Sequence, residues 1–157
     1  YLNQIPWEDT RDQLNLRYQV QNMDNYPWSK KDKTCNGCFA AGINFGASII
    51  SLLYGEADLK ETIKIGTLAG WDSDNPTSTW GGLIGFMIGK EKIEEIFGRE
   101  FSSRFNIHRT RKGFSNQGID NFRNMALKRQ SIVDRVVLKK MAGVIDTINN
   151  KWLIPID

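Results

Sequence analysis

The sequence predicts a mainly helical protein, and three observations carry this prediction. Helix start and stop signals recur between residues 36 and 97, a longer basic helix is indicated after residue 120, and strand-like runs are confined to the C-terminal end. Of the 157 residues, 40% are hydrophobic and 25% are charged, as in an ordinary globular domain. This apolar content supports a buried core and excludes disorder as a description of the whole chain.

The N-terminal segment predicts a short helix followed by a loop. Asp9 or Thr10 is suited to cap a helix that runs to about Val20, although its apolar residues follow the helical period poorly. Residues 21–34 contain Pro27, several Asn and Asp residues and three lysines, so we expect an exposed loop there.

Residues 36–54 give the strongest helical pattern in the chain. Three polar residues form one narrow strip on an otherwise apolar cylinder, namely Asn44, Ser48 and Ser51. A membrane span needs about 20 predominantly apolar residues, and polar residues interrupt this run, so we expect a buried helix and no membrane partner. Gly55 is placed to end the helix in the left-handed conformation.

The next helix has a clear start signal. Asp58 precedes Glu61 by three residues, a spacing that resembles a capping box. We expect this helix to run to about Leu68 and to end at Gly70.

A glycine-rich helix follows. Asn75 is a good N-cap and Pro76 a good first helical residue, so the helix is expected to run to about Ile88. A short helix is then expected over residues 92–97. Glycines four residues apart leave one face of the first helix bare and predict a close helix–helix approach at Gly81, Gly85 and Gly89.

The C-terminal part predicts a loop, a basic helix and a hairpin. Residues 98–119 are loop-like, and a helix is expected over residues 121–141. Residues 144–147 and 152–156 can pair as two short strands around Asn149-Asn150, which adds a short C-terminal β-hairpin to the helical fold.

The two cysteines, Cys35 and Cys38, do not indicate a metal site. A structural zinc site needs four ligands, and His108, the only histidine, is far along the chain. A thioredoxin-like redox pair would need a βαβ context, which the sequence does not show. We expect two small buried apolar side chains near a helix start, with the redox compartment left open, and a surface position for His108.

Charge is unevenly distributed along the chain. The formal net charge is +3, yet residues 1–90 carry 8 basic and 10 acidic groups, whereas residues 99–140 carry 11 basic and 3 acidic groups. The run Arg109–Lys112 is suited to hold a phosphate, and the alternative is a solvated helix face and loop. No nucleic-acid-binding motif accompanies the basic segment, so nucleic acid is not the expected partner.

The sharpest chemical feature is the segment Gly70–Asn75. It places Asp72 and Asp74 two residues apart, between two expected helices. On a helix these side chains would point in nearly opposite directions, whereas in a bend entered through glycine they can converge. Mg²⁺ binds oxygen ligands of this kind, usually one or two carboxylates with several waters. The alternative is that acidic residues only favour the start of the next helix, through capping and the helix dipole.

Four motifs within residues 35–90 stand in a characteristic order. They are Asn36-Gly37, Leu53-Tyr54-Gly55-Glu56-Ala57-Asp58-Leu59, Gly70-Trp71-Asp72-Ser73-Asp74-Asn75, and Gly81-Gly82-Leu83-Ile84-Gly85 continuing to Gly89. This arrangement resembles the C-terminal half of the ADP-ribosylglycohydrolase family. The resemblance implies an all-α fold, a multi-helix orthogonal bundle, with a binuclear Mg²⁺ site in a cleft that Mn²⁺ can also occupy.

The resemblance also implies roles for the residues of the bend. Asp72 and Asp74 would be metal ligands. Asn75 stands where many family members have a threonine ligand, so it is either a third ligand or only the N-cap of the next helix. Trp71 either stacks on an adenine or sugar face or packs in the core. The residues expected to contact substrate are Gly70, Trp71 and Ser73, and no catalytic residue is assigned.

The family pattern has parts that this sequence lacks, namely an N-terminal Gly-Asp motif, a Thr/Ser-Asp-Asp cluster and an acidic residue near the start of the enzyme. We therefore expect residues 1–157 to be the C-terminal portion of a larger catalytic domain, with residues 35–97 as the family core and 98–157 as a basic C-terminal extension. The missing N-terminal half would supply the other ligands and the acid–base group, and this chain alone would be inactive.

The implied function is Mg²⁺-assisted cleavage of a glycosidic bond in ADP-ribose or an ADP-ribosylated substrate, in the cytoplasm. One alternative is a non-catalytic helical binding module that uses residues 99–140 for an anionic partner. Another is a purely structural helical domain, in which Asp72 and Asp74 are helix-start residues.

Overall fold

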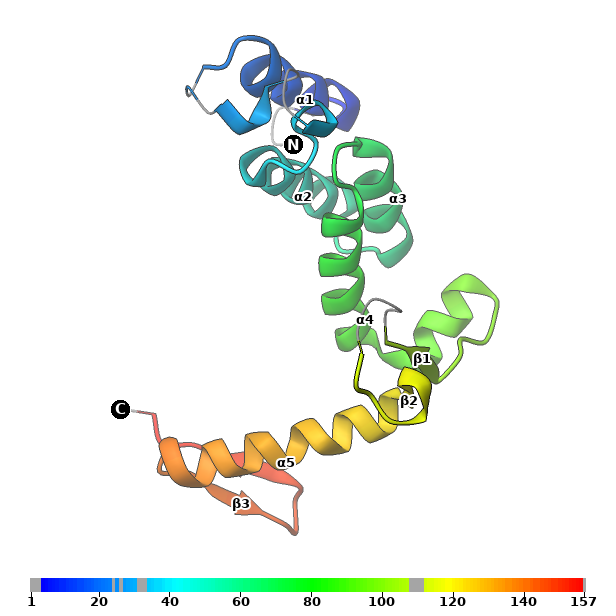
Figure 1. Cartoon of the computed structure of the whole chain (residues 1–157), viewed down its shortest axis with the longest axis vertical. Coiled ribbons are helices and arrows are strands. Elements are labelled where there is room, and N and C mark those ends of the chain that lie inside the picture. Colours follow the sequence, from blue (N-terminus) through cyan, green and yellow to red (C-terminus); the bar gives the residue numbers. More distant parts are fainter. Residues whose placement is uncertain (1–3, 24, 26, 31–33, 108–111, 157) are drawn as a thin grey trace. The chain divides into compact units, whose positions relative to one another are not determined.

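The computed structural model describes residues 4–23, 25, 27–30, 34–107 and 112–156. The chain divides into two compact units, an N-terminal unit that ends at Arg99 and a C-terminal unit that begins at Glu100 (Figure 1). The described part is mostly helical with two small antiparallel sheets, which confirms the mainly helical class expected from the sequence. None of the helices in this part is long and apolar enough to cross a membrane.

The N-terminal unit begins with α1 (Trp7–Asn15), which continues as the π-helical turn η1 (Leu16–Val20). The short turns η2 (Pro27–Ser29) and η3 (Thr34–Gly37) follow. The expectation that Asp9 or Thr10 caps the first helix is wrong, because α1 starts directly after Pro6 without a side-chain cap. Thr10 instead shares a 2.7 Å hydrogen bond with the Tyr54 hydroxyl and so ties α1 to α2.

The central helix α2 (Ala41–Gly55) starts five residues later than the sequence pattern indicates. Cys35 and Asn36 have φ angles of 55° and 52°, so η3 is a separate turn and the helix cannot begin there. Gly55 is the last helical residue, and the left-handed residue is Glu56, with φ 49°. A Cβ on Gly55 would lie 2.6 Å from the Cα of Thr62, so this glycine is required for close packing.

The helix α3 (Leu59–Ala69) confirms its sequence signals at both ends. The Asp58 carboxylate accepts a 2.8 Å hydrogen bond from the backbone N–H of Glu61. Gly70 follows the last helical residue with φ 92°. Both signals are local, so the sequence could specify them without knowledge of the tertiary structure.

The helix α4 (Asp74–Phe97) is broken at Gly89, where φ is 81° and ψ is 164°. The break agrees with the expected helix end near Ile88 and the second short helix after it. The expected close helix–helix approach along the three glycines is not found. A Cβ on Gly81 would meet Ile63 of α3 at an ordinary 3.5 Å, and one on Gly85 would meet Ile93 of α4 itself at 3.1 Å.

The core of the N-terminal unit lies where α2, α3 and α4 pack on one another, with α1 against α2. In Figure 1, α2 runs across the direction of α4. The buried apolar side chains described in this unit come mainly from α2 and α3: Ala40, Ile43, Ala47, Ile50, Leu59, Ile65, Ala69 and Ile84. Asn44 and Ser51, from the polar strip of α2, are also buried. This packing fixes the bend between α3 and α4.

In its described residues, the C-terminal unit contains two pairs of short antiparallel strands and one long helix. The strands β1 (Arg104–Asn106) and β2 (Ile119–Asn121) pair antiparallel with Phe105 opposite Asp120, and the short turn η4 (Asn116–Gly118) precedes β2. The expectation of a loop over residues 98–119 is therefore partly wrong. Each strand has only three residues, so the alternation of Phe105 and Ile107 is too short a pattern to identify a strand from the sequence.

The helix α5 (Phe122–Lys140) agrees with the sequence prediction, and the final hairpin is present with a second strand that ends at Leu153, earlier than expected. Asn121 caps α5 by accepting a 2.8 Å hydrogen bond from the N–H of Asn124. The strands β3 (Val144–Asp146) and β4 (Lys151–Leu153) pair antiparallel, and Trp152 of β4 donates a 2.8 Å hydrogen bond to Asp134 of α5. Among the described residues of this unit, Val137 is the one buried hydrophobic side chain.

Candidate functional site

The bend between α3 and α4 brings together all six residues that the sequence singled out. Gly70 has φ 92° and ψ −157°, a conformation that is essentially restricted to glycine. Trp71 follows with φ 56°. These two residues reverse the chain before Asp74 begins α4, so the side chains that follow are not separated by a helical period.

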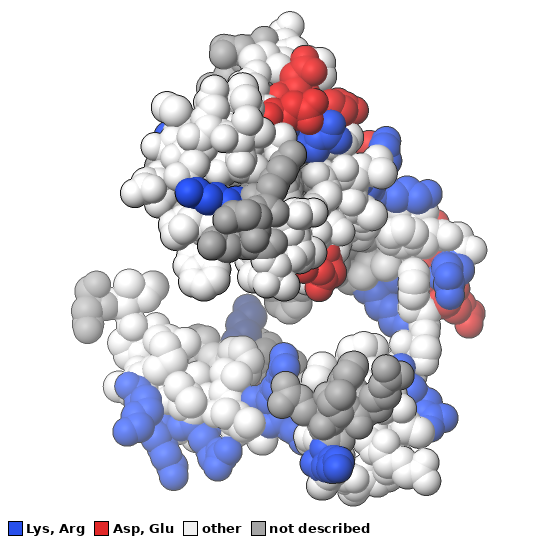
Figure 2. Space-filling view, turned by 45° about the horizontal axis from the view of Figure 1, so that its top comes forward, with Lys and Arg blue, Asp and Glu red and all other residues white. Residues whose placement is uncertain are grey.

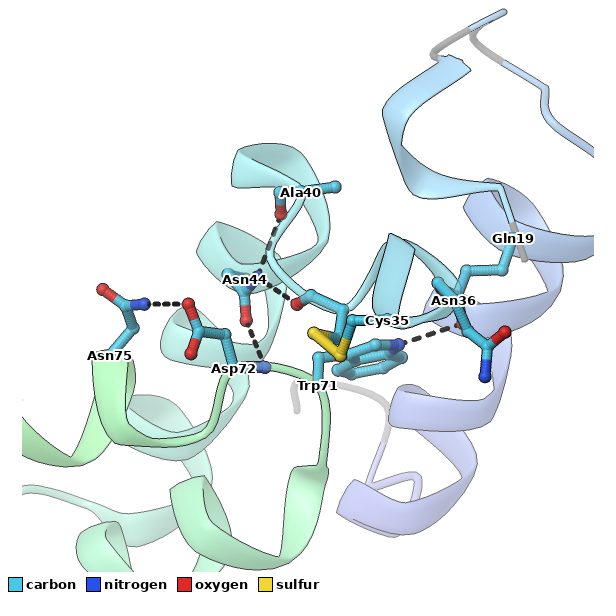
Figure 3. Close-up of a disulfide and its surroundings, with 9 residues drawn as sticks. Gln19, Cys35, Asn36, Ala40, Asn44, Trp71, Asp72 and Asn75 are labelled. Atoms are coloured by element: carbon cyan, nitrogen blue, oxygen red, sulfur yellow. Dashed lines mark hydrogen bonds between the residues drawn. A yellow bond between two sulfur atoms is a disulfide. The ribbon is translucent and has the colours of Figure 1, made fainter. Parts of the chain in front are cut away.

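Asp72 and Asp74 lie close enough in this bend for one carboxyl group to affect the ionisation of the other. Asp74 raises the pKa of Asp72, mainly through a hydrogen bond between the two carboxyl groups, with further contributions from desolvation and from the negative charge of Asp74. Asn75 opposes this shift by donating a 2.6 Å hydrogen bond from Nδ2 to Oδ2 of Asp72 (Figure 3). Two acidic side chains this close to each other are placed to share one cation.

Asn75 is not the N-cap of α4, which corrects one of its two expected roles. The helix starts at Asp74 with Ser73 in the N-cap position, and Ser73 makes no side-chain cap. The amide of Asn75 points its nitrogen toward Asp72. It therefore positions the carboxylate in this structure, and its carbonyl oxygen is the atom that remains for a metal.

The donor set of the bend fits one hard divalent cation better than two. Mg²⁺ usually takes one or two protein carboxylates and keeps several waters, and the bend offers two carboxylates. Within the part of the chain that the structure describes, no group of three or more His, Cys, Asp or Glu side chains is placed to hold a metal. A second ion would need ligands that these residues do not provide.

Trp71 and Asp72 are held in place by side chains that the sequence did not point out as site residues. The Trp71 indole N–H donates a 3.0 Å hydrogen bond to Gln19 Oε1. The Asp72 backbone N–H donates a 3.1 Å hydrogen bond to Asn44 Oδ1. Asn44 belongs to the polar strip noted on α2, and this strip was the available signal, whereas nothing local connects Gln19 to Trp71.

A groove of about 500 Å³ lies next to the bend. Asn75 of the bend and Asn44, which accepts a hydrogen bond from the bend, both line the groove. The apolar wall of the groove consists of side chains from the residues just before α2, from α2 and from α4: Phe39, Phe45, Ile49 and Trp80. Phe45 is 69% exposed, so the wall offers aromatic surface to a ligand beside the two carboxylates.

The cysteines form a disulfide, Cys35–Cys38, and this corrects the expectation of two buried apolar side chains. Cys35 is exposed and Cys38 is half-buried. The intervening residues form the tight turn η3, which brings the two side chains together. The disulfide lies close to the bend (Figure 3).

The basic segment forms an exposed surface on the C-terminal unit, where Figure 2 shows prominent Lys and Arg side chains. Lys128 pairs with Asp120 at 3.1 Å. A cavity of about 420 Å³ within this unit is bordered by Arg104 and Lys128. Of the phosphate-binding run expected at Arg109–Lys112, only Lys112 falls within the described residues, and His108 also lies outside them.

Comparisons of the chain with protein-family models, with curated proteins and with solved structures find no match in any of the three. The function therefore has to be argued from the bend, the groove and the basic surface themselves.

Proposed function

We propose that the bend between α3 and α4 binds a divalent cation, Mg²⁺ or Mn²⁺, as part of a hydrolase that resembles the ADP-ribosylglycohydrolases. The observation that carries this proposal is the bend itself, which places Asp72 just before and Asp74 at the first residue of α4, close enough for Asp74 to raise the pKa of Asp72. The two negative carboxylates repel each other when they lie close together. A bound divalent cation neutralises this charge and so stabilises the bend with both carboxylates side by side. The remaining ligands and the acid–base group come from a further polypeptide segment.

The proposed reaction is cleavage of a glycosidic bond in ADP-ribose or an ADP-ribosylated substrate. The cation, when bound, supplies Lewis-acid polarisation of a substrate oxygen or activation of a water. Asp72 and Asp74 hold it, and Asn75 fixes the rotamer of Asp72 through its 2.6 Å hydrogen bond. The aromatic wall of the groove takes the planar face of the base or the apolar face of a sugar, which orients the substrate beside the carboxylates.

Metal titration tests this proposal directly. Isothermal titration of the chain with Mg²⁺ or Mn²⁺ is expected to show binding that the double variant Asp72→Ala, Asp74→Ala loses. The matched control is Glu8→Ala, Asp9→Ala, which removes two acidic side chains from exposed positions of α1. Retention of full affinity in the bend variant, or equal loss in both variants, contradicts the proposal.

The pH dependence gives an independent check. A proton and the cation compete for Asp72, whose pKa lies above that of an ordinary exposed aspartate. Metal affinity is therefore expected to fall as pH drops through this raised pKa, at a higher pH than simple exposed carboxylates would give. In the metal-free protein, the raised pKa means that Asp72 binds a proton more tightly in the folded state than in the unfolded state. Asp72 therefore contributes to stability at low pH, and this contribution is lost as pH rises through the raised pKa.

The basic surface of the C-terminal unit supports a second candidate function, a non-catalytic module for an anionic partner. Within the described residues, no ion pair neutralises five exposed cations of α5: Arg123, Arg129, Arg135, Lys139 and Lys140. Binding of a fluorescent single-stranded RNA, used as a polyanion probe, would then weaken steeply with salt. It would be unchanged in the Asp72→Ala, Asp74→Ala variant, which separates the two functions.

A further inference from the structure

The disulfide turn that leads into α2 has an uncommon backbone conformation. Cys35, Asn36 and Gly37 have φ angles of 55°, 52° and 71°, so three successive residues are left-handed. Residues with a Cβ rarely adopt this conformation, and two of the three have one. The Cys35–Cys38 bond closes the turn and restricts the alternatives open to it. Without that bond, the turn is expected to relax to other conformations.

Asn44 connects this turn to the bend (Figure 3). Its Nδ2 donates hydrogen bonds to the backbone carbonyl of Cys38 at 2.7 Å and to that of Ala40 at 3.1 Å. Its Oδ1 accepts the 3.1 Å hydrogen bond from the backbone N–H of Asp72. Because Asn44 is buried and its amide is planar, a shift of the Cys38 carbonyl is passed to the Asp72 backbone.

Gln19 makes a second, separate connection between the same two segments. Its Nε2 donates a 2.7 Å hydrogen bond to the backbone carbonyl of Asn36, inside the disulfide turn. Its Oε1 accepts the 3.0 Å hydrogen bond from the Trp71 indole. Two consecutive residues of the bend are therefore each held by one amide side chain whose other end depends on the disulfide turn.

We propose that the Cys35–Cys38 disulfide is a reversible redox modification site that controls the conformation of the bend. The exposed position of Cys35 makes it the sulfur that a dithiol reductant attacks. The reductant thiolate forms a mixed disulfide with Cys35, and Cys38 leaves as a thiolate that takes a proton. The second thiol of the reductant then displaces Cys35. Two electrons and two protons pass to the protein, and the reductant becomes a cyclic disulfide.

Reduction frees the left-handed turn, and with it the two carbonyl groups that Asn44 and Gln19 bind. The bend then loses fixed positions for the Trp71 indole and the Asp72 backbone. In the cytoplasmic location proposed for this protein, the Cys35–Cys38 bond would be reversible, because disulfides in cytosolic proteins are usually transient and redox-sensing. The effect on metal affinity rests on the proposed function, whereas the effect on the bend does not.

Hydrogen exchange measured by NMR tests the proposal. The probes are the Asp72 amide and the Trp71 indole N–H, compared in the oxidised chain and after reduction with dithiothreitol. Exchange of both is expected to become about tenfold faster or more on reduction, while the amide of Ile65 in the core of α3 keeps its rate. The control variant, Cys35→Ser with Cys38→Ser, should resemble the reduced chain and show no response to dithiothreitol.

Two results would overturn the proposal. One is unchanged exchange at Asp72 and Trp71 on reduction of the unmodified chain, a comparison that does not require the serine variant to fold. The other is an equal acceleration at Ile65, which would make the disulfide a general stabiliser of the unit. Mg²⁺ titration of the two forms should give a roughly fivefold weaker affinity after reduction. Absence of Mg²⁺ binding in both forms contradicts the proposed metal site, and exchange still decides the redox proposal.

Discussion

The contact between α2 and α3 at Gly55 gives the sharpest prediction about the packing of the N-terminal unit. A Cβ added at Gly55 would collide with Thr62 Oγ1 and would lie 2.6 Å from the Cα and 2.7 Å from the backbone N of Thr62. Carbon atoms need about 3.5 Å, so Gly55→Ala must move the two helices apart by about 1 Å. Two of the atoms met are backbone atoms, so no side-chain rotation relieves the clash.

The magnitude follows from two opposing contributions. Overpacking of this kind costs about 3 kcal/mol, near the top of its usual range because backbone must move. The helix propensity of alanine over glycine returns about 1 kcal/mol. We expect Gly55→Ala to be less stable by about 2 kcal/mol, measured by urea unfolding and circular dichroism.

The matched control is Gly82→Ala, an exposed position in α4 where an added Cβ meets no atom within 4 Å. This variant should be more stable by about 1 kcal/mol through helix propensity alone. If both glycine variants shift the unfolding midpoint by the same amount in the same direction, the close approach of α2 and α3 at Gly55 is refuted.

Three further predictions concern buried and hydrogen-bonded polar groups. Asn44→Leu loses three hydrogen bonds, so it should lower the free energy of unfolding, measured in urea, by about 3 kcal/mol. It should also accelerate hydrogen exchange of the Asp72 amide, and unaltered exchange would show that Asn44 does not hold the bend. Thr62→Val should raise stability by about 1 kcal/mol, because the buried Thr62 hydroxyl has no hydrogen-bond partner among the described residues; a loss of stability would reveal one. Hydrogen bonds from the Asn149 side chain and backbone lower the pKa of Asp146. The ionised Asp146 therefore contributes to stability above the ordinary pKa of an aspartate, and this contribution is lost as pH falls through the lowered pKa. Asp146→Asn should therefore flatten the acid side of the stability profile, followed by circular dichroism between about pH 2 and pH 5, and an unchanged profile would contradict this assignment.

Elements with local signals could be predicted from the sequence. The Asp58 and Asn121 caps each bond to an N–H three residues away, so a short stretch of sequence determines them. The bend was found for the same reason, because its glycine and its two aspartates are adjacent in the chain. Its role as a metal site stays a prediction, since the described residues supply two carboxylates and no further cluster of ligands.

Features that depend on distant residues could not be predicted in this way. The start of α2 is preceded by a disulfide turn with three left-handed residues, and the apolar pattern alone extends the expected helix back into that turn despite its Asn36-Gly37 pair. Gln19 and Trp71 are 52 residues apart, and Asn44 and Asp72 are 28 apart. Such contacts arise only when α1, α2 and the bend have packed, because no sequence period connects them.

The uneven core has a consequence for how this chain unfolds. Eight of the nine buried hydrophobic side chains in the described residues belong to the N-terminal unit, and only Val137 belongs to the C-terminal unit. Hydrophobic burial supplies most of the favourable free energy of folding, so the two units should lose structure at different denaturant concentrations. Calorimetric enthalpy would then exceed the van't Hoff enthalpy, and the helical signal of α5 would disappear first. The Gly55 and Thr62 substitutions should shift only the second of these transitions.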